Sequence, residues 1–346
     1  MARAPRGDTK RYADRMIRAD GPTLPRYPLA LIHPLGPLFR HLPLSLRRHL
    51  LYLRALGRWG DFRTPRLAGE KAQWRIINDR RPLLAFVEDK LASKEYVKSA
   101  LDKAGLFEQV RFPETYWVGT DLRELQALAH KLPARWVLKP NHSCGRYILL
   151  DTKTKPVDWK AVAAISTRWL DRDEEELVLG HWAYSQARHL LIAQERVGTV
   201  GAGLTELKVV STGGEAQYYF YGDRLNPHGY YECHFPDGTR FSWGEGDDPF
   251  QYYPEISDNV RHLLLDAARA ISAPFDEVRA DFFLWEGKLW AGEITAYGAS
   301  GLTRTAGDID AWLGAAWQLP DLTAPDPREA EWRALLEGTP KGTLQR

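Results

Sequence analysis

The sequence has few cysteines and no long hydrophobic run. Among 346 residues the only cysteines are Cys144 and Cys233, and neither lies in a Cys-x-x-Cys or Cys/His cluster. This scarcity argues against a disulfide framework and against a structural zinc site. No segment approaches the roughly 18 apolar residues that a membrane span requires. No apolar segment follows the charged start either, so we expect a cytoplasmic protein without a secretory signal.

The net charge is also small, at +2, but it is unevenly distributed. Residues 1–75 hold 16 Lys and Arg against 5 Asp and Glu, whereas the rest of the chain is acidic. This asymmetry favours either an acidic partner, such as nucleic acid or a membrane surface, or attraction between the two parts within one fold. The leucine-rich, arginine-decorated stretch within 26–60 leaves a similar choice, because a basic amphipathic helix either lies on a membrane or packs on its own domain.

Hydrophobic periodicity predicts a mixed α+β chain arranged in lobes, without internal repeats. Ser93 is expected to begin a helix that Gly105 ends, and Asp121 to cap the next helix. Further helices are expected in 158–190, 257–272 and 308–318. The expected strands are 135–139, 146–151, 190–197, 206–212, 216–222 and a hairpin within 278–298.

The hairpin at 278–298 is the most informative segment. Side chains alternate along a strand, so Arg279 and Asp281 share one face. A three-residue loop at 285–287 makes Asp281 and Glu293 diagonal neighbours within roughly 8 Å. Two facing carboxylates repel unless a cation lies between them, and Mg²⁺ prefers hard oxygen ligands. The pair therefore indicates either a metal platform for ATP or a solvated sheet face on which Arg279 neutralises Asp281.

A second constellation is WVLKPNHSCGRY, residues 136–147. Lys139 ends an apolar strand, and a lysine in a buried strand needs an anionic partner. The polar loop that follows, with His142, Ser143 and Gly145, offers backbone N–H groups that can cover phosphates. It is not a P-loop, because GxxxxGK[ST] is absent.

These segments occur in the order of an ATP-grasp enzyme, and the chain resembles the TupA-like ATP-grasp family, named for a protein of teichuronopeptide synthesis. The matching motifs are GEKAQWRIINDRRPLL (69–84), EDKLASKEYV (88–97), VLKPNHSCG (137–145) and GKLWAGEITAYGASG (287–301). The resemblance implies an ATP-grasp fold of two α+β lobes that hold ATP between them. We therefore expect a disordered basic tail (1–25), from its polar and basic composition, a helical N-terminal region (26–88), an N-lobe (89–190), a C-lobe (191–320) and a C-terminal tail (321–346).

The same resemblance implies roles for individual residues. Its nucleotide contacts are Lys90, Lys139, His142, Ser143, Gly145, Gln194, Glu195, Val197, Glu206 and Lys208. Its Mg²⁺ ligands are Asp281, Glu293 and Thr295, and its catalytic residues are Arg279, Lys208 and Arg304. Arg304 follows the glycine-rich segment after the hairpin, where it either grips a substrate carboxylate or pairs with an acidic residue of the next helix.

The expected reaction is ATP-dependent joining of a carboxylate to an amine. A carboxylate is a poor electrophile, and phosphorylation by ATP supplies the leaving group that it lacks, so lysine, arginine and Mg²⁺ can perform the catalysis by charge neutralisation. One alternative is a kinase or phosphotransferase, with His142 or His228 as a phosphate carrier. Another is a nucleic-acid or membrane-surface adaptor that uses residues 1–75.

Overall fold

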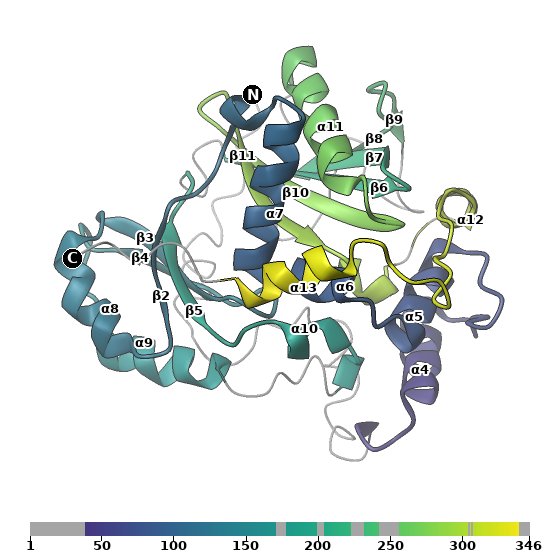
Figure 1. Cartoon of the computed structure of the whole chain (residues 1–346), viewed down its shortest axis with the longest axis horizontal. Helices are drawn as coiled ribbons and strands as arrows, with labels where there is room; N and C mark the ends of the chain where they lie inside the picture. The colour runs from purple at the N-terminus through teal and green to yellow at the C-terminus, as the bar shows by residue number, and fades with distance from the viewer. Residues whose placement is uncertain are drawn as a thin grey trace, which may run out of the picture.

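The computed structural model describes residues 39–170, 178–198, 204–222, 232–241, 256–303, 305 and 307–338. Two β-sheets and the helices around them make up this part, which confirms the expected α+β class (Figure 1). The expected tail at 1–25 lies outside the described residues, as does Arg304. No helix among the described residues is long and apolar enough to span a membrane.

The larger sheet has seven strands in the order β1-β11-β10-β6-β7-β8-β9. Its strands are β1 (Val110–Arg111), β6 (Thr205–Thr212), β7 (Glu215–Gly222), β8 (Glu232–His234), β9 (Arg240–Phe241), β10 (Glu277–Trp285) and β11 (Lys288–Thr295). All neighbours are antiparallel except β1 and β11. The glycine pair at 213–214 turns the expected β6–β7 hairpin, with both glycines in the left-handed region.

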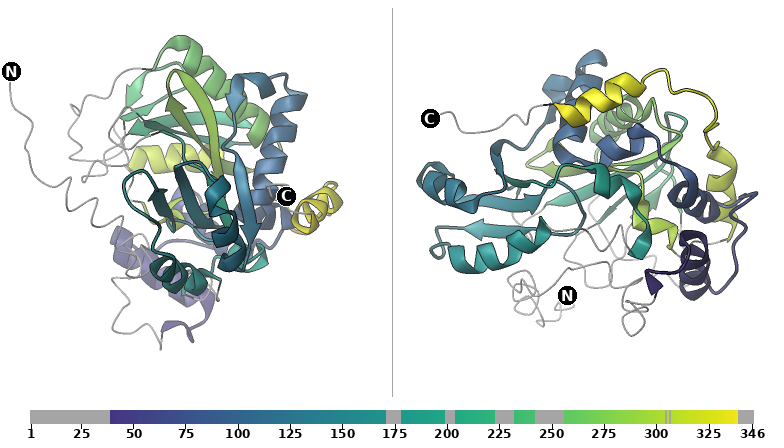
Figure 2. Two further views of the ribbon diagram at one scale, coloured as in Figure 1. Left: turned by 90° about the vertical axis from the view of Figure 1, so that its left-hand side faces the viewer. Right: turned by 60° about the horizontal axis from the view of Figure 1, so that its bottom comes forward.

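The smaller sheet has four strands in the order β2-β5-β3-β4. Its strands are β2 (Thr115–Gly119), β3 (Arg135–Pro140), β4 (Ile148–Asp151) and β5 (Leu191–Glu195). Together with α8 (Leu122–Leu128) and α9 (Trp159–Ser166) it forms a lobe at the left of Figure 1, and the right-hand view of Figure 2 shows the same separation. Because β5 joins this sheet and β1 joins the larger one, the two sheets do not divide the chain at a single residue.

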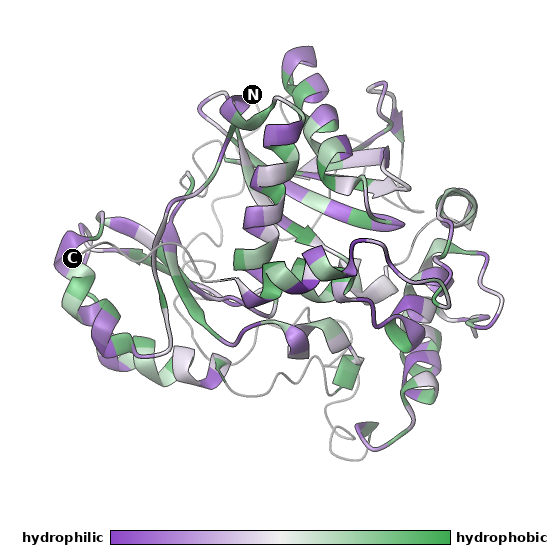
Figure 3. Ribbon diagram, in the orientation of Figure 1, coloured by the Kyte–Doolittle hydropathy of each residue, from purple (hydrophilic) through white to green (hydrophobic). Residues whose placement is uncertain are grey.

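The main core lies on one face of the larger sheet. Six helices contribute to it: α5 (Ala68–Asn78), α6 (Pro82–Glu88), α7 (Lys90–Lys103), α10 (Trp182–Gln186), α11 (Asp258–Ser272) and α13 (Glu329–Glu337). Polar and apolar residues alternate along α7 and α11, as expected for helices with one buried face (Figure 3). On the sheet, Leu207 and Val209 of β6 and Phe282 of β10 point into this core. Side chains alternate along strands, so the charged residues between them face the opposite side.

Asp89, not Ser93, begins helix α7. The Asp89 carboxylate accepts a hydrogen bond from the Ala92 N–H at 2.9 Å, whereas Ser93 is buried inside the helix. The expectation at Ser93 was therefore wrong by one turn. The other expected signals are confirmed: Asp121 caps α8, and Gly105 is left-handed just after α7 ends.

Helix α4 (Leu44–Leu56) buries two arginines together with Leu51 and Tyr52, while three of its leucines stay exposed. Arg47 and Arg48 are buried, while Leu46, Leu50 and Leu53 are 36 to 41% exposed. Arg48 donates to the carbonyl oxygens of residues 179 and 300, and Arg47 to that of residue 178. The helix therefore packs on its own chain, one of the two alternatives that the sequence left open, and the buried arginines satisfy backbone carbonyls there.

Candidate active site

The β10–β11 hairpin has a two-residue turn, not the three-residue loop that we expected. Trp285 pairs with Lys288, and the two residues between them have φ of 50° and 68°. Both central residues are left-handed, as the tight hairpin turn that matches strand twist requires. Continued without a break, this register would put Glu293 on the apolar face of the sheet.

A β-bulge restores the carboxylate pair. Ala280 pairs with Ile294 but Phe282 pairs with Ala291, so Gly292 and Glu293 together oppose Asp281. A Cβ on Gly292 would lie 2.6 Å from the Asp281 carbonyl oxygen, which explains why glycine stands at the bulge. Asp281 and Glu293 thus line the same cleft, for a reason different from the one expected.

Two cations contact Asp281. Arg279 donates to its two carboxylate oxygens at 2.6 and 2.8 Å, and Lys208 Nζ donates at 2.9 Å. Lys208 also lies 3.3 Å from the Glu206 carboxylate. Burial by itself would raise the pKa of Asp281, but Arg279 and then Lys208 outweigh it, and the pKa lies below its usual value. Asp281 is therefore ionised at neutral pH, between two positive charges.

A cleft of about 200 Å³ lies between the two sheets, and Asp281 and Glu293 form part of its wall. From the smaller sheet and its loops come Lys139, Ser143, Gly145, Arg146, Gln194, Glu195 and Val197. From the larger sheet come Glu206 and Lys208, and Lys90 contributes from the start of α7. The structure thus brings together most of the nucleotide contacts that the resemblance implied. Arg146 is an addition; its position two residues after Cys144 in the same loop could have revealed it.

The loop after β3 reaches the cleft in an unusual backbone conformation. Ser143 and Gly145 have φ of 67° and 68°. Lys90 Nζ donates to the Ser143 carbonyl oxygen at 2.5 Å and so ties the loop to α7. The His142 side chain is fully buried, and its ring stacks on the His189 ring with 3.9 Å between the ring centroids. His142 does not line the cleft. Burial lowers the pKa of His142 to about 3, so its ring is neutral.

Two further residues of the expected site are not part of the cleft wall that the structure describes. Thr295 pairs with Arg279 across the hairpin, next to the ion cluster but outside the cleft wall. Arg304 lies outside the described residues, so its role remains a prediction.

A second, larger cavity of about 560 Å³ opens on the same face of the larger sheet. It shares Lys208 with the cleft, and Arg279 lies in its wall. Its remaining wall includes Val210, Thr212, Tyr218, Phe220, Glu277, Asp310, Leu313 and Trp317. Sequence reasoning did not find this cavity, because its residues come from segments that are far apart in the sequence. Only Glu277, two residues before Arg279 on one strand face, gave a local signal.

Part of the cavity wall is a left-handed turn held by the N-terminal region. Ala299 and Ser300 have φ of 45° and 58°, which is uncommon for residues other than glycine. Arg48 donates to the Ser300 carbonyl oxygen at 2.7 Å and to its hydroxyl at 3.1 Å, and Gln73 donates to the same carbonyl. Residues 48 and 73 thus fix a turn that is more than 220 residues away in the sequence.

No family model and no curated protein matches the chain. Among solved structures it is similar to D-alanine–D-alanine ligase from Helicobacter pylori, with 12% identity over 68% of this chain and 61% of that one, at a TM-score of 0.37. It is also similar to an L-amino acid ligase from Bacillus licheniformis, with 15% identity over 74% of this chain and 54% of that one, at a TM-score of 0.40. The chain thus spans less than two thirds of either enzyme.

Proposed function

We propose that the chain is an ATP-grasp ligase of the TupA-like type, which joins a small-molecule carboxylate to an amine and forms ADP and phosphate. The observation that carries this proposal is the meeting of two cavities at Lys208, beside the Arg279–Asp281 ion pair. One cavity suits a nucleotide and the other suits the molecule to be phosphorylated. The transferred phosphoryl group would lie where the two cavities join.

The cleft between the sheets has the chemistry that ATP needs. Lys90, Lys139 and Lys208 line it as phosphate partners, and Val137 and Leu149 add apolar surface for a base. The edge at residues 194–197 is suited to the adenine, and Glu206 to the ribose hydroxyls. The cleft thus combines apolar surface with many charged groups, which suits a ligand that has an aromatic base at one end and phosphates at the other.

The donor set also fits Mg²⁺. Asp281 and Glu293 present hard carboxylate oxygens to one cleft, and no described residue forms a hydrogen bond or ion pair with the Glu293 side chain. These two carboxylates would hold the ion, with Thr295 next along β11. When bound, Mg²⁺ would neutralise phosphate charge during transfer.

The chain's own residues would orient and neutralise the reacting groups. A substrate carboxylate oxygen attacks the γ-phosphorus, and the bond to the ADP oxygen breaks with its electron pair leaving on ADP. Arg279 and Lys208, which both contact Asp281 where the two cavities meet, would neutralise the negative charge that accumulates in that step. The amine then attacks the acyl carbon, loses a proton, and phosphate departs with the C–O electrons. The product is an amide.

The test is a product balance with hydroxylamine as the amine. A ligase forms ADP, phosphate and a hydroxamate in equal amounts from a panel of amino acids and sugar acids. A kinase instead forms ADP without free phosphate and no hydroxamate. A His142 phosphate carrier is disfavoured already, because that ring is buried and stacked away from the cleft. ATP turnover without hydroxamate from any acid would contradict the ligase.

Lys139→Ala should weaken ATP binding. Lys139 pairs with Ile192 in the smaller sheet and lines the cleft. Removing a charge-assisted phosphate contact costs about 1.5–3 kcal/mol, so the dissociation constant for ATP should rise roughly 10- to 100-fold. The thermal shift produced by a fixed ATP concentration should therefore shrink. Lys131→Ala, an exposed lysine of the same lobe, is the control. An unchanged ATP shift in Lys139→Ala would make Lys139 a structural residue.

A further inference from the structure

The larger cavity carries opposite charges at two places on one strand. Arg279 lies beside the cleft, and Glu277 lies two residues earlier on the same face of β10, about 7 Å away along the strand. Thr212 of β6 is the cross-strand partner of Glu277. A molecule in this cavity thus meets a cationic group at the phosphate end and an anionic group farther in.

Only one oxygen of the Glu277 carboxylate has a hydrogen-bond partner among the described residues. Its Oε2 accepts from Arg75 Nη1 at 2.5 Å, but Oε1 has no hydrogen bond in the described part of the chain. Arg75 is also shared with Asp276, at 2.8 Å. Burial raises the pKa of Glu277 in spite of Arg75, so one shared arginine compensates this carboxylate incompletely. A second cation against Oε1 would favour its ionised form.

The other carboxylate of the cavity has its partners already. Asp310 pairs with Arg58 at 2.6 Å and accepts from the Gly69 N–H at 2.9 Å. Its charge is therefore balanced within the fold. Glu277 is the acidic group of this cavity that remains available to a ligand.

A buried threonine borders the same place. Thr212 is 5% exposed and lines the cavity, and its Oγ1 is shielded from solvent and has no hydrogen-bond partner among the described residues. Buried polar side chains nearly always have a partner, so an unpartnered one beside a cavity points to a ligand. A change of the Thr212 χ1 rotamer moves the hydroxyl, and Oγ1 and Glu277 Oε1 are then two acceptors that suit a group with several N–H donors.

The remaining wall is largely apolar. Val210, Tyr218, Phe220, Leu313 and Trp317 line the cavity around the two polar ends. An apolar side chain of a ligand would be removed from water against this wall. A charged side chain of a ligand would find no oppositely charged partner there.

We propose that the larger cavity binds an amino acid with an apolar side chain, whose ammonium group donates to Glu277 Oε1 and, after a change of the Thr212 rotamer, to Thr212 Oγ1. Its carboxylate faces Arg279 and Lys208, and its side chain packs on the apolar wall. Two ion contacts and the short backbone of an amino acid together span the separation between Glu277 and Arg279. This inference rests on the proposed function, since it makes that carboxylate the one that ATP activates.

The experiment compares acids that differ only in the ammonium group. L-Alanine, L-leucine and L-phenylalanine are each paired with their deaminated counterparts propionate, 4-methylvalerate and 3-phenylpropionate. Binding is measured by calorimetry in the presence of ADP and Mg²⁺, and turnover as hydroxamate formation. We expect at least one amino acid to bind the native enzyme about 10- to 100-fold more tightly than its counterpart.

Two variants test the two contacts separately. Glu277→Gln and the near-isosteric Thr212→Val should each reduce this preference, Glu277→Gln to nearly none, with ADP affinity unchanged. Glu215→Gln, an exposed carboxylate on β7 of the same sheet, should behave like the native enzyme. If Glu277→Gln fails to fold, Thr212→Val still tests the site.

The outcomes separate this inference from the proposed function. Equal binding of all three pairs to the native enzyme, or an undiminished preference in both variants, would overturn the ammonium site even if ATP turnover is normal. Failure of ATP to bind or to form ADP with any acid would overturn the ligase. An ammonium preference measured by calorimetry and lost in the variants would then still support the ammonium site.

Discussion

Replacing Glu293 by glutamine should reduce ADP formation by about 10³-fold, while the protein keeps its fold. Glu293 faces Asp281 at the bulge of the β10–β11 hairpin and lines the cleft. The change removes a negative charge from the proposed Mg²⁺ site and keeps the size of the side chain. Because no described residue forms a hydrogen bond or ion pair with Glu293, folding should not depend on that charge.

ADP release at several Mg²⁺ concentrations and the melting temperature together measure this effect. Excess Mg²⁺ should restore part of the rate, since a weakened site is filled at higher concentration. Glu286→Gln makes the same chemical change at the exposed turn of the same hairpin and should leave the rate unchanged. Full turnover of Glu293→Gln at ordinary Mg²⁺ would remove Glu293 from the metal site.

The sequence predicted this face of the sheet but not its register. Alternation along β10 correctly placed Arg279 and Asp281 together, because the period of two is a local property of strands. The hairpin turn and the bulge at Gly292 compensate each other, so an incorrect loop length led to a correct pairing of faces. A bulge depends on how two strands pair, and no local sequence pattern predicted this one.

Long-range contacts account for the other differences. Asp89 begins α7 because its carboxylate also binds Arg188, at 2.7 Å, from a segment 99 residues later. Arg48 is buried because the carbonyl of residue 300, on a distant turn, needs a donor. A periodicity argument assigns arginine to solvent, since it considers only neighbours on the same helix. The larger cavity was missed for the same reason.

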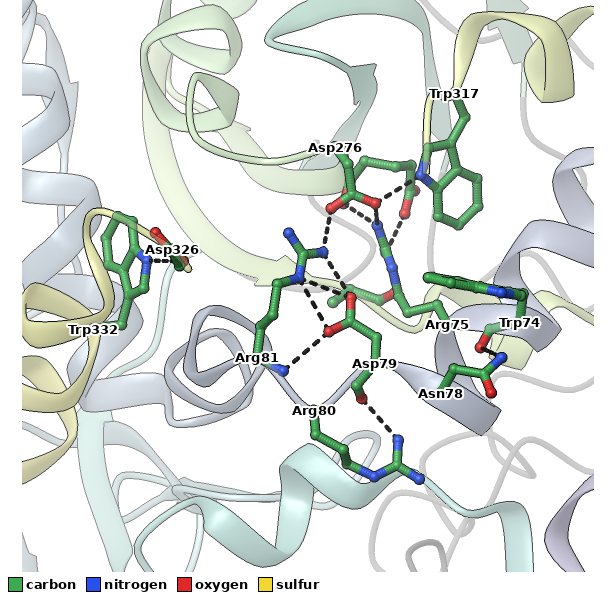
Figure 4. Close-up of polar contacts among 12 residues, drawn as sticks. Trp74, Arg75, Asn78, Asp79, Arg80, Arg81, Asp276, Trp317, Asp326 and Trp332 are labelled. Atoms are coloured by element: carbon green, nitrogen blue, oxygen red, sulfur yellow. Dashed lines mark hydrogen bonds and ion pairs between the residues drawn. The ribbon is translucent and has the colours of Figure 1, made fainter. Parts of the chain in front are cut away.

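The second large effect is expected for stability, at the ion network around Arg75 (Figure 4). Arg75 is 1% exposed and contacts the Asp276 carboxylate at 2.8 Å and the Glu277 carboxylate at 2.5 Å. Its guanidinium also lies 4.4 Å from the centre of the Trp317 ring, whose indole N–H donates to Asp276. Arg81 supplies the other cation for Asp276, at 2.7 Å.

Arg75→Met should lower the free energy of unfolding by about 3–5 kcal/mol at neutral pH. Methionine fills much of the space, but it leaves Glu277 buried with no ion-pair partner and leaves Asp276 dependent on Arg81. An uncompensated buried charge is the main cost. Arg333→Met is the control, because Arg333 pairs with Glu329 on the exposed side of α13 and such pairs contribute little. Denaturant unfolding of both variants measures the difference.

The difference in unfolding free energy between the native protein and Arg75→Met should shrink as the pH falls, because acid neutralises the carboxylates that the variant leaves unpaired. In the native protein, burial by itself would raise the pKa of Asp276, but Arg75 and Arg81 outweigh it and lower that pKa to about 2 from the usual 3.8. The stability that this lowered pKa contributes is complete above about pH 4 and is lost as the pH falls towards 2. Without Arg75 the pKa of Asp276 rises and that of Glu277 rises further, so acidification from about pH 4 towards pH 2 costs the variant less stability than the native chain. A difference that stays constant from pH 7 down through this range would show that Arg75 acts by packing on Trp317, not by charge.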